Sequence, residues 1–145
     1  MSLEENRTLV RHLYEAGNKK KLAIFDELVA PTCVASLAGI AEPLHGPQAL
    51  KQTAQVYNTA FPDLQVTVDD MTCEGDKVVV RWTAQGTHKG ELMSLAPTGK
   101  RLKATGIDIF RITNGKIVAI WGQFDVLSIL KQLDVLPTSI TSMVR

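Results

Sequence analysis

The hydrophobic pattern of this 145-residue chain changes from a helical period to a period of two at Gln65, and this change limits its fold. Before Gln65 the apolar residues recur every three or four positions, as on one face of a helix. After Gln65 they alternate with polar residues, as on a strand with one buried face. Helices followed by a run of strands indicate an α+β fold in which helices cover one side of a sheet.

The first two predicted helices have clear boundaries. Ser2 and Glu5 have the spacing of a capping box, in which a hydroxyl and a carboxylate each bind a free backbone N–H group. The first helix therefore begins there, and Gly17-Asn18 ends it. The second helix is predicted from about Lys20 to Val29. Ala30-Pro31 ends it because the residue before a proline is disfavoured in a helix.

The remaining elements follow in order. A short strand is predicted within 33–42, and a third helix runs from Pro47 to Phe61. Asn114-Gly115 is a strong hairpin signal, because both central positions of a type I′ turn need a positive φ. A last short helix is predicted from Val126 to Leu133. The strands predicted from the period of two are 65–73, 77–88, 100–112 and 116–124.

The strand predicted over Lys100–Ile112 carries one charged residue on its apolar face. A buried carboxylate is costly unless it is paired, hydrogen-bonded or protonated, so Asp108 is a candidate functional residue. The alternative is that Asp108 caps a turn or pairs with an arginine across the sheet. The face consists of Leu102, Ala104, Gly106, Asp108, Phe110 and Ile112.

Composition and charge exclude several classes of protein. The chain is 45% hydrophobic and 21% charged, which is typical of a globular domain. Its net charge of +1 and the absence of a basic block give no sign of a nucleic-acid or membrane partner. No signal peptide or membrane span is recognised. Cys33 and Cys73 lack disulfide or zinc spacing, which indicates buried thiols in a reducing cytosol. We expect a cytoplasmic domain over 1–136, a loose tail over 137–145, and no metal site.

Six short motifs occur in one order along the chain. Together they resemble the SnoaL-like polyketide cyclase family, also called predicted ester cyclases, of the NTF2-like superfamily. The resemblance runs from about Glu4 to Leu136. The motifs are F-P-D-L (61–64), G-D-K-V-V-V-R-W (75–82), G-T-H-K-G (86–90), P-T-G-K (97–100), G-I-D-I-F-R-I (106–112) and N-G-K-I-V-x-x-W (114–121).

The resemblance implies a fold and a chemistry. The fold is a cone-shaped α+β barrel, with N-terminal helices packed on a curved antiparallel sheet around a hydrophobic pocket. Such proteins are usually homodimers without a metal ion or organic cofactor. The family's cyclases close a ring by an intramolecular aldol reaction, in which a carboxylate removes a proton next to a carbonyl and polar groups stabilise the enolate. Related pockets isomerise ketosteroids, open epoxides or only bind ligands, so the fold alone does not fix the reaction.

This sequence departs from the family pattern at the usual acid/base positions. The family's cyclases carry the acid/base Asp on the last strand, where this chain has Gly122, and a His two residues earlier, where it has Ile120. The polar pair often seen after the second helix corresponds to Ala35-Ser36. Asp108 is therefore the leading remaining carboxylate for this chemistry.

His88 is the expected partner of Asp108. Both residues fall on the apolar face of their own strand, so they would form an acid/base pair if both faces line one cavity. The alternative is that His88 lies near the surface at the end of its strand. His12 and His45 are expected on the surface.

The pocket wall is expected to be aromatic and apolar, although such residues equally fit a hydrophobic core. Met93 lies in the 89–99 connection, a candidate lid. Trp121 is expected on the outer face of the sheet, where a homodimer interface would lie, and Asp125 is expected to cap the last helix. The expected substrate-binding residues are Tyr14, Tyr57, Phe61, Trp82, Met93, Phe110, Ile120, Gly122 and Phe124.

Two functions remain open at this stage. The first is a cofactor-independent cyclase or isomerase acting by acid/base chemistry on a hydrophobic, polyketide-like carbonyl compound, with Asp108 as the base. The second is a non-catalytic protein that binds hydrophobic small molecules and has lost the family's acid/base Asp. Hydrolysis of an epoxide or lactone is a third reading, but it requires a carboxylate network around a water molecule that this sequence does not show.

Overall fold

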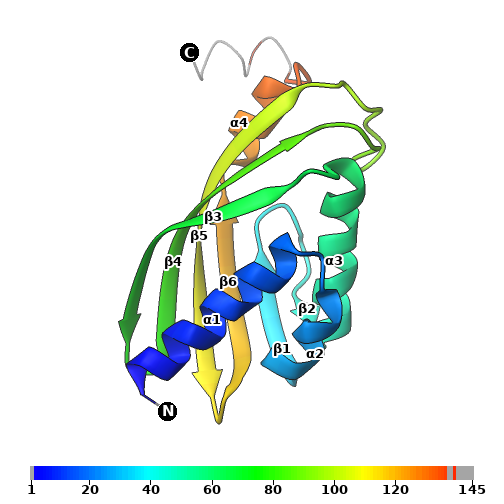
Figure 1. Ribbon diagram of the computed structural model, residues 1–145. Helices are drawn as coiled ribbons and strands as arrows, with labels where there is room; N and C mark the ends of the chain where they lie inside the picture. The colour runs from blue at the N-terminus through cyan, green and yellow to red at the C-terminus, as the bar shows by residue number, and fades with distance from the viewer. Residues whose placement is uncertain (1, 137–138, 140–145) are drawn as a thin grey trace.

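The change of period at Gln65 marks the first of four long strands in the computed structural model, which describes residues 2–136 and 139. Each of these strands pairs with the next in an antiparallel arrangement. Figure 1 shows them curving together as one twisted sheet. The strands are β3 Gln65–Glu74, β4 Lys77–Thr87, β5 Arg101–Thr113 and β6 Lys116–Phe124.

Three helices pack against this sheet, on one face and at one end. We call the covered face the inner face. α1 (Leu3–Asn18) crosses that face, and α3 (Gly46–Ala60) stands beside the strands formed by the residues before it (Figure 1). α4 (Val126–Gln132) follows β6 and packs on β5. None of the described helices has the length and apolar character needed to cross a membrane.

The predicted helix caps are confirmed. The backbone N–H of Glu5 donates to Ser2 Oγ over 3.0 Å, and the N–H of Ser2 donates to Glu5 Oε1 over 3.2 Å, which completes the capping box. At α4 the N–H of Ser128 donates to Asp125 Oδ1 over 3.0 Å. Asp125 therefore satisfies a free backbone N–H group at the start of that helix.

The second helix is shorter than predicted. Lys20 has a φ of 58°, and the N–H of Lys21 donates to the carbonyl of Ala16 over 2.9 Å. These features form a Schellman motif, so the two lysines end α1 and cannot begin the next helix. A 3₁₀ turn, η1 (Leu22–Ile24), and a single helical turn, α2 (Phe25–Leu28), follow instead.

The segment after α2 forms a longer and earlier strand than predicted. β1 (Val29–Leu37) pairs with β2 (Leu44–His45) on one side and runs parallel to β6 on the other. Pro31 lies where the β1–β6 register is irregular, between Val29 and Val34, so its missing N–H group costs no regular pairing. The sheet is therefore mixed and unclosed rather than purely antiparallel, with the strand order β2-β1-β6-β5-β4-β3.

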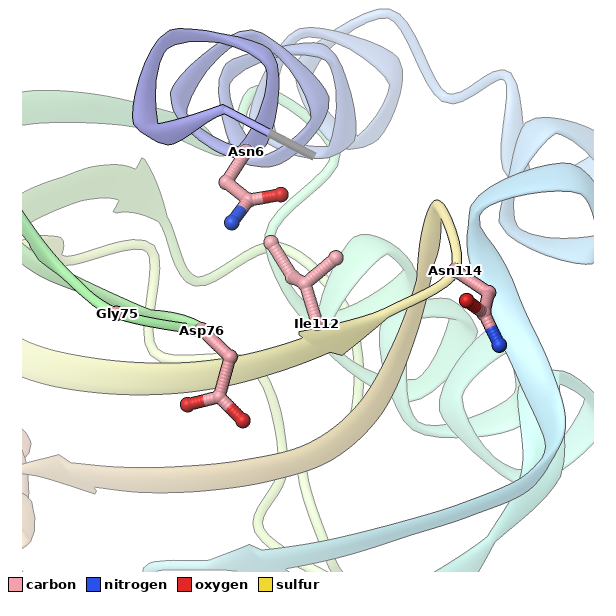
Figure 2. Close-up of a pocket in the computed structure, with 5 residues that line it drawn as sticks. All are labelled: Asn6, Gly75, Asp76, Ile112 and Asn114. Atoms are coloured by element: carbon pink, nitrogen blue, oxygen red, sulfur yellow. The ribbon is translucent and has the colours of Figure 1, made fainter.

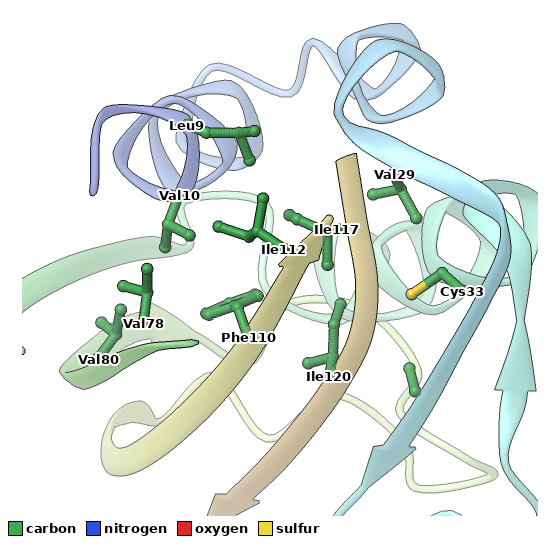
Figure 3. Close-up of a cluster of buried hydrophobic side chains, with 11 residues drawn as sticks. Leu9, Val10, Val29, Cys33, Val78, Val80, Phe110, Ile112, Ile117 and Ile120 are labelled. Atoms are coloured by element: carbon green, nitrogen blue, oxygen red, sulfur yellow. The ribbon is translucent and has the colours of Figure 1, made fainter. Parts of the chain in front are cut away.

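Two groups of buried residues lie at opposite ends of the inner face. Figure 3 shows the first, where Leu9 and Val10 of α1 point toward the sheet. Cys33 belongs to this group, and burial raises the pKa of its thiol to about 11, as expected for an inert buried cysteine. Cys73 is only partly buried. The first core cluster is Leu9, Val10, Val29, Cys33, Ala35, Val78, Val80, Phe110, Ile112, Ile117 and Ile120. The second core cluster is Ala60, Phe61, Leu92, Leu102 and Leu133.

Two tight turns have both central residues in the left-handed region. The predicted Asn114-Gly115 turn is confirmed, with φ values of 51° and 75°. Met93 and Ser94 adopt similar values of 45° and 75° between Leu92 and Leu95, which exchange backbone hydrogen bonds of 3.0 and 2.8 Å. Neither Met nor Ser favours this conformation, so the turn carries backbone strain.

We predict that Ser94→Gly stabilises the protein. Glycine removes the steric cost of the left-handed backbone but makes the unfolded chain more flexible, which leaves a net gain of about 0.5–1 kcal/mol. Urea denaturation measures the free energy of unfolding. Ser94→Ala removes the hydroxyl and keeps the strain, so it is the matched control and should change stability little. An equal gain for both variants would show that the backbone strain is not the cause.

Candidate active site

Asp108 lies on the inner face of β5, where the sequence pattern placed it. It faces Val80 of β4 on one side and Gly122 of β6 on the other. Met71 and Leu37 extend the same row across β3 and β1. Asp108 is therefore the charged member of a row whose other side chains are apolar or absent.

Tyr14 of α1 binds this carboxylate. Its hydroxyl donates a hydrogen bond to Asp108 Oδ2, across 94 positions of the sequence. The phenol ring packs edge-on against Phe110, with ring centroids 5.9 Å apart and an interplanar angle of 82°. This hydrogen bond is what satisfies the buried carboxylate. No arginine pairs with Asp108 in the part of the chain that the structure describes.

Trp82 of β4 borders the same carboxylate. Its indole N–H is buried and makes no hydrogen bond of normal geometry within the described residues, but it is near enough to favour the charged form of Asp108. The ring lies against Gly106, where a Cβ atom would come within 2.3 Å of Trp82 Cζ2. Gly106 therefore allows the indole to lie close to β5 beside Asp108.

Burial is the dominant electrostatic influence on the pair. It raises the pKa of Asp108, while the hydrogen bond from Tyr14 and the indole of Trp82 act in the opposite direction. Burial also raises the pKa of Tyr14, and the adjacent carboxylate raises it further. The phenol therefore stays protonated and donates to a carboxylate that is more basic than an exposed aspartate.

The burial of the inner face varies along the strands. The row containing Phe110 belongs to the first core cluster, and the row containing Leu102 belongs to the second. Between them lie the partly buried Asp108 and Trp82, as the cross-strand register shows. This middle stretch is therefore less deeply buried than the two core clusters that flank it.

Aromatic rings line the middle stretch next to Asp108. Phe124 of β6 lies 6.3 Å from the ring of Trp82, between centroids. Tyr57 of α3 packs edge-on against the same Phe124 ring, with centroids 6.5 Å apart. Three of the expected pocket residues therefore form one partly exposed aromatic row beside the carboxylate.

The structure does not bring His88 to Asp108. Val80 faces Asp108, and His88 lies eight residues farther along the chain, about 26 Å for an extended strand. His88 is fully buried, and its Nδ1 accepts the backbone N–H of Thr98 over 3.3 Å. Its ring stacks at a tilt on Phe61, with centroids 5.5 Å apart. The alternative of a surface histidine is also wrong, because the 89–99 connection covers it.

The other expected site residues are divided between core and surface. Ile120 is buried in the first core cluster and Phe61 in the second. Met93 is 62% exposed at its turn, so it does not line the inner face. Trp121 is 43% exposed on the outer face, as expected. His12 and His45 are exposed, also as expected.

Asp108 itself lines neither of two surface hollows. The smaller, of about 190 Å³, is lined by Asn6, Gly75, Asp76, Ile112 and Asn114, between the start of α1 and two hairpin turns (Figure 2). The larger, of about 430 Å³, is lined by Arg81, Ile107 and Gln123 of the outer face of the sheet, and also by Trp82, Gly106 and Phe124 of the candidate site. The described residues contain no group of three His, Cys, Asp or Glu side chains that could hold a metal ion.

The sequence matches the family model described as SnoaL-like polyketide cyclase over residues 7–133. The chain belongs to this family. A comparison with curated proteins finds no match.

Solved structures agree with this assignment. IdmH, a proposed polyketide cyclase from Streptomyces antibioticus, is 34% identical with a TM-score of 0.79, over 90% of this chain and 99% of that one. AclR, a proposed hydroxylase from Streptomyces galilaeus, is 28% identical with a TM-score of 0.83, over 94% and 100%. A proposed SnoaL-like polyketide cyclase from Jannaschia sp. CCS1 shares the fold, with a TM-score of 0.84, 21% identity and coverage of 92% and 94%. The predicted NTF2-like α+β fold is confirmed.

The contact between Tyr14 and Asp108 is the feature of this SnoaL-like protein that the sequence did not predict. Tyr14 was expected only as part of the pocket wall. A signal existed, because Tyr14 follows Val10 by four positions and so shares its helix face. That signal becomes usable only when it is known which strand lies under that turn of the helix.

The raised pKa of Asp108 makes the stability of the SnoaL-like protein depend on pH in a defined direction. The folded state holds the Asp108 proton more tightly than the unfolded state does. Asp108 therefore does not oppose folding when the pH lies below the pKa of this carboxyl in the unfolded chain, about 4. As the pH rises from there through the higher pKa in the folded protein, ionisation of Asp108 increasingly destabilises the fold.

We predict that Asp108→Asn is more stable than the wild type at neutral pH. The amide oxygen still accepts the Tyr14 hydroxyl, and the gain is about 1.4 kcal/mol for each unit by which folding raises the pKa. The difference should vanish as the pH is lowered to about 4, as measured by urea denaturation at each pH. Asp76→Asn is the opposite control, because Arg111 lowers the pKa of Asp76 and this variant should lose stability at neutral pH. A pH-independent gain for Asp108→Asn would contradict the assignment.

Proposed function

We propose that this protein is a cofactor-independent cyclase or isomerase that acts on a hydrophobic carbonyl compound, with Asp108 as the general base. The observation that supports it most is the hydrogen bond from Tyr14 to Asp108 on an otherwise apolar face. Membership of the SnoaL-like family supports the same class of reaction. Tyr14 thus takes the partner role that the sequence suggested for His88.

The proposed reaction begins when the ionised Asp108 removes a proton from the carbon next to a carbonyl group. The electron pair of the C–H bond moves to the carbonyl and forms an enolate. In an isomerisation, Asp108 returns the proton to another carbon of the conjugated system. In a ring closure, the enolate carbon attacks a second carbonyl, a C–C bond forms, and the resulting alkoxide takes the proton.

The environment of Asp108 favours this role. A general base works best when its pKa approaches the working pH, and burial moves the pKa of Asp108 in that direction. Tyr14 holds Oδ2, so the carboxylate has a fixed orientation before a substrate arrives. Trp82, Phe124 and Tyr57 offer apolar and aromatic surface for a flat, hydrophobic substrate.

We predict that Asp108→Asn lowers turnover by at least about 10²-fold, since a positioned general base contributes roughly 10²–10⁴-fold. A panel of polycyclic ketones and esters serves as substrates, and mass spectrometry follows the products. Isomerisation and aldol closure conserve the mass, whereas the hydroxylation proposed for AclR would add one oxygen atom. Asp76→Asn is the matched control and should keep wild-type turnover.

The results of this experiment separate the two functions. Binding of panel members without turnover in wild type or variant would refute the enzymatic function and support the non-catalytic binding function. Turnover that is unchanged in Asp108→Asn would leave the enzyme in place but remove Asp108 as its base.

We also propose that the outer face of the sheet forms a homodimer interface. Ile107, Trp121 and Val34 are exposed on this face by 49%, 43% and 38%. Trp121 lies beside Ile109 of β5 in the register of the sheet, and Ile107 is the next residue of β5 on the same face. An exposed apolar area of this kind marks an interaction surface.

We predict that Trp121→Glu weakens the dimer by at least about 10-fold, because it places a charge in an apolar contact. Sedimentation velocity over a range of protein concentrations measures the dissociation constant. Val56→Glu is the matched control, since Val56 is 42% exposed on α3, away from the outer face. A wild type that is monomeric at all concentrations would exclude the interface.

A further inference from the structure

Gly122 faces Asp108 directly across the β5–β6 ladder. A Cβ atom on Gly122 would lie 2.7 Å from Asp108 Oδ1 and 3.0 Å from Leu37 Cδ2. The first of these distances is shorter than a van der Waals contact between carbon and oxygen. The carboxylate therefore occupies space that a side chain at position 122 would need.

The two oxygens of this carboxylate have different neighbours. Oδ2 accepts the hydrogen bond from Tyr14, and Oδ1 lies toward Gly122. The carboxylate is a rigid planar group, so a push on Oδ1 also moves Oδ2. A side chain on Gly122 would consequently disturb the bond to Tyr14 without touching Tyr14 itself.

We infer that Gly122 is a positioning residue for the candidate base: its lack of a side chain sets the orientation in which Asp108 meets Tyr14. The importance of this orientation for turnover rests on the proposed function. The positioning itself is a property of the folded protein and can be tested without a substrate.

The test is a double-mutant cycle between positions 122 and 108. Gly122→Ala, Asp108→Ala and the double variant are compared with the wild type by urea denaturation. Gly122→Ala should lower the unfolding midpoint in the wild type, because its methyl group collides with Oδ1. Most of that loss should disappear in the Asp108→Ala background, where only the contact with Leu37 remains to be adjusted.

Gly86→Ala is the matched control for this cycle. Gly86 is also a buried glycine on the sheet, and a Cβ there would lie 3.0 Å from Phe61 Cβ and 3.5 Å from Asp63 Oδ1. It belongs to the opposite end of β4 from the residues that face Asp108. Its loss of stability should therefore be the same with and without Asp108.

A second measurement reports on the carboxylate itself. Carbon-13 NMR of the Asp108 carboxyl group, assigned by its absence in Asp108→Asn, follows its titration with pH. Gly122→Ala should shift the titration midpoint because the contact with Tyr14 changes, and Gly86→Ala should leave it in place. A general loss of stability would not distinguish these two glycine variants in this way.

Each outcome bears on the inference. Additive losses in the cycle, or an unchanged Asp108 titration in Gly122→Ala, would overturn it. If Gly122→Ala alone does not fold, a folded Gly122→Ala/Asp108→Ala protein supports the inference. An unfolded double variant beside a folded Asp108→Ala protein overturns it. Coupling between the positions without turnover of any substrate would leave the positioning intact and refute the proposed enzyme.

Discussion

The packing of α1 against the inner face of the sheet determines where the candidate site lies. Val10 of the helix belongs to the first core cluster together with Val78 and Phe110 of the sheet. This burial is apolar and has no directional preference of its own. Tyr14, one turn farther along the same helix face, is thereby carried over Asp108. Non-directional apolar burial thus places the hydroxyl that donates a hydrogen bond to Asp108.

The two core clusters leave Asp108 and Trp82 only partly buried between them. One cluster seals the sheet under α1, and the other seals the opposite end with Phe61, Leu92 and Leu102. A continuous core along the whole face would be more stable, because each additional buried side chain contributes about 1.5–3 kcal/mol. The interruption at Asp108 and Trp82 gives up part of that stability, which is the pattern expected where a fold serves a function.

The parts of the fold that the sequence predicted well are those set by near neighbours. The capping box at Ser2, the Asn114-Gly115 turn and the alternation along β5 each depend on residues within a few positions. β1 was predicted too short and too late. Its pairing with β6 joins segments more than 80 positions apart, and no local pattern encodes that contact or its parallel direction.

The prediction for His88 shows how a correct local pattern can still mislead. The alternation of side chains along the strand placed the imidazole on the inner side, and the residue is buried there. Alternation does not give the distance between two residues along a strand, however, and the residue of β4 that faces Asp108 is Val80. The partner of Asp108 came instead from a helix 94 positions away, a contact that depends on the tertiary packing of α1.

The departures from the family pattern limit the chemistry that the proposed site can perform. Ile120 is part of the first core cluster, and Gly122 has no side chain to offer, so β6 contributes no acid or base on this face. One carboxylate held by one phenol supplies roughly 10²–10⁴-fold by proton transfer. Further acceleration must come from the orientation of the substrate and from its own acidity. The substrates that suit such a site are therefore those whose proton is already activated, for example by two flanking carbonyl groups.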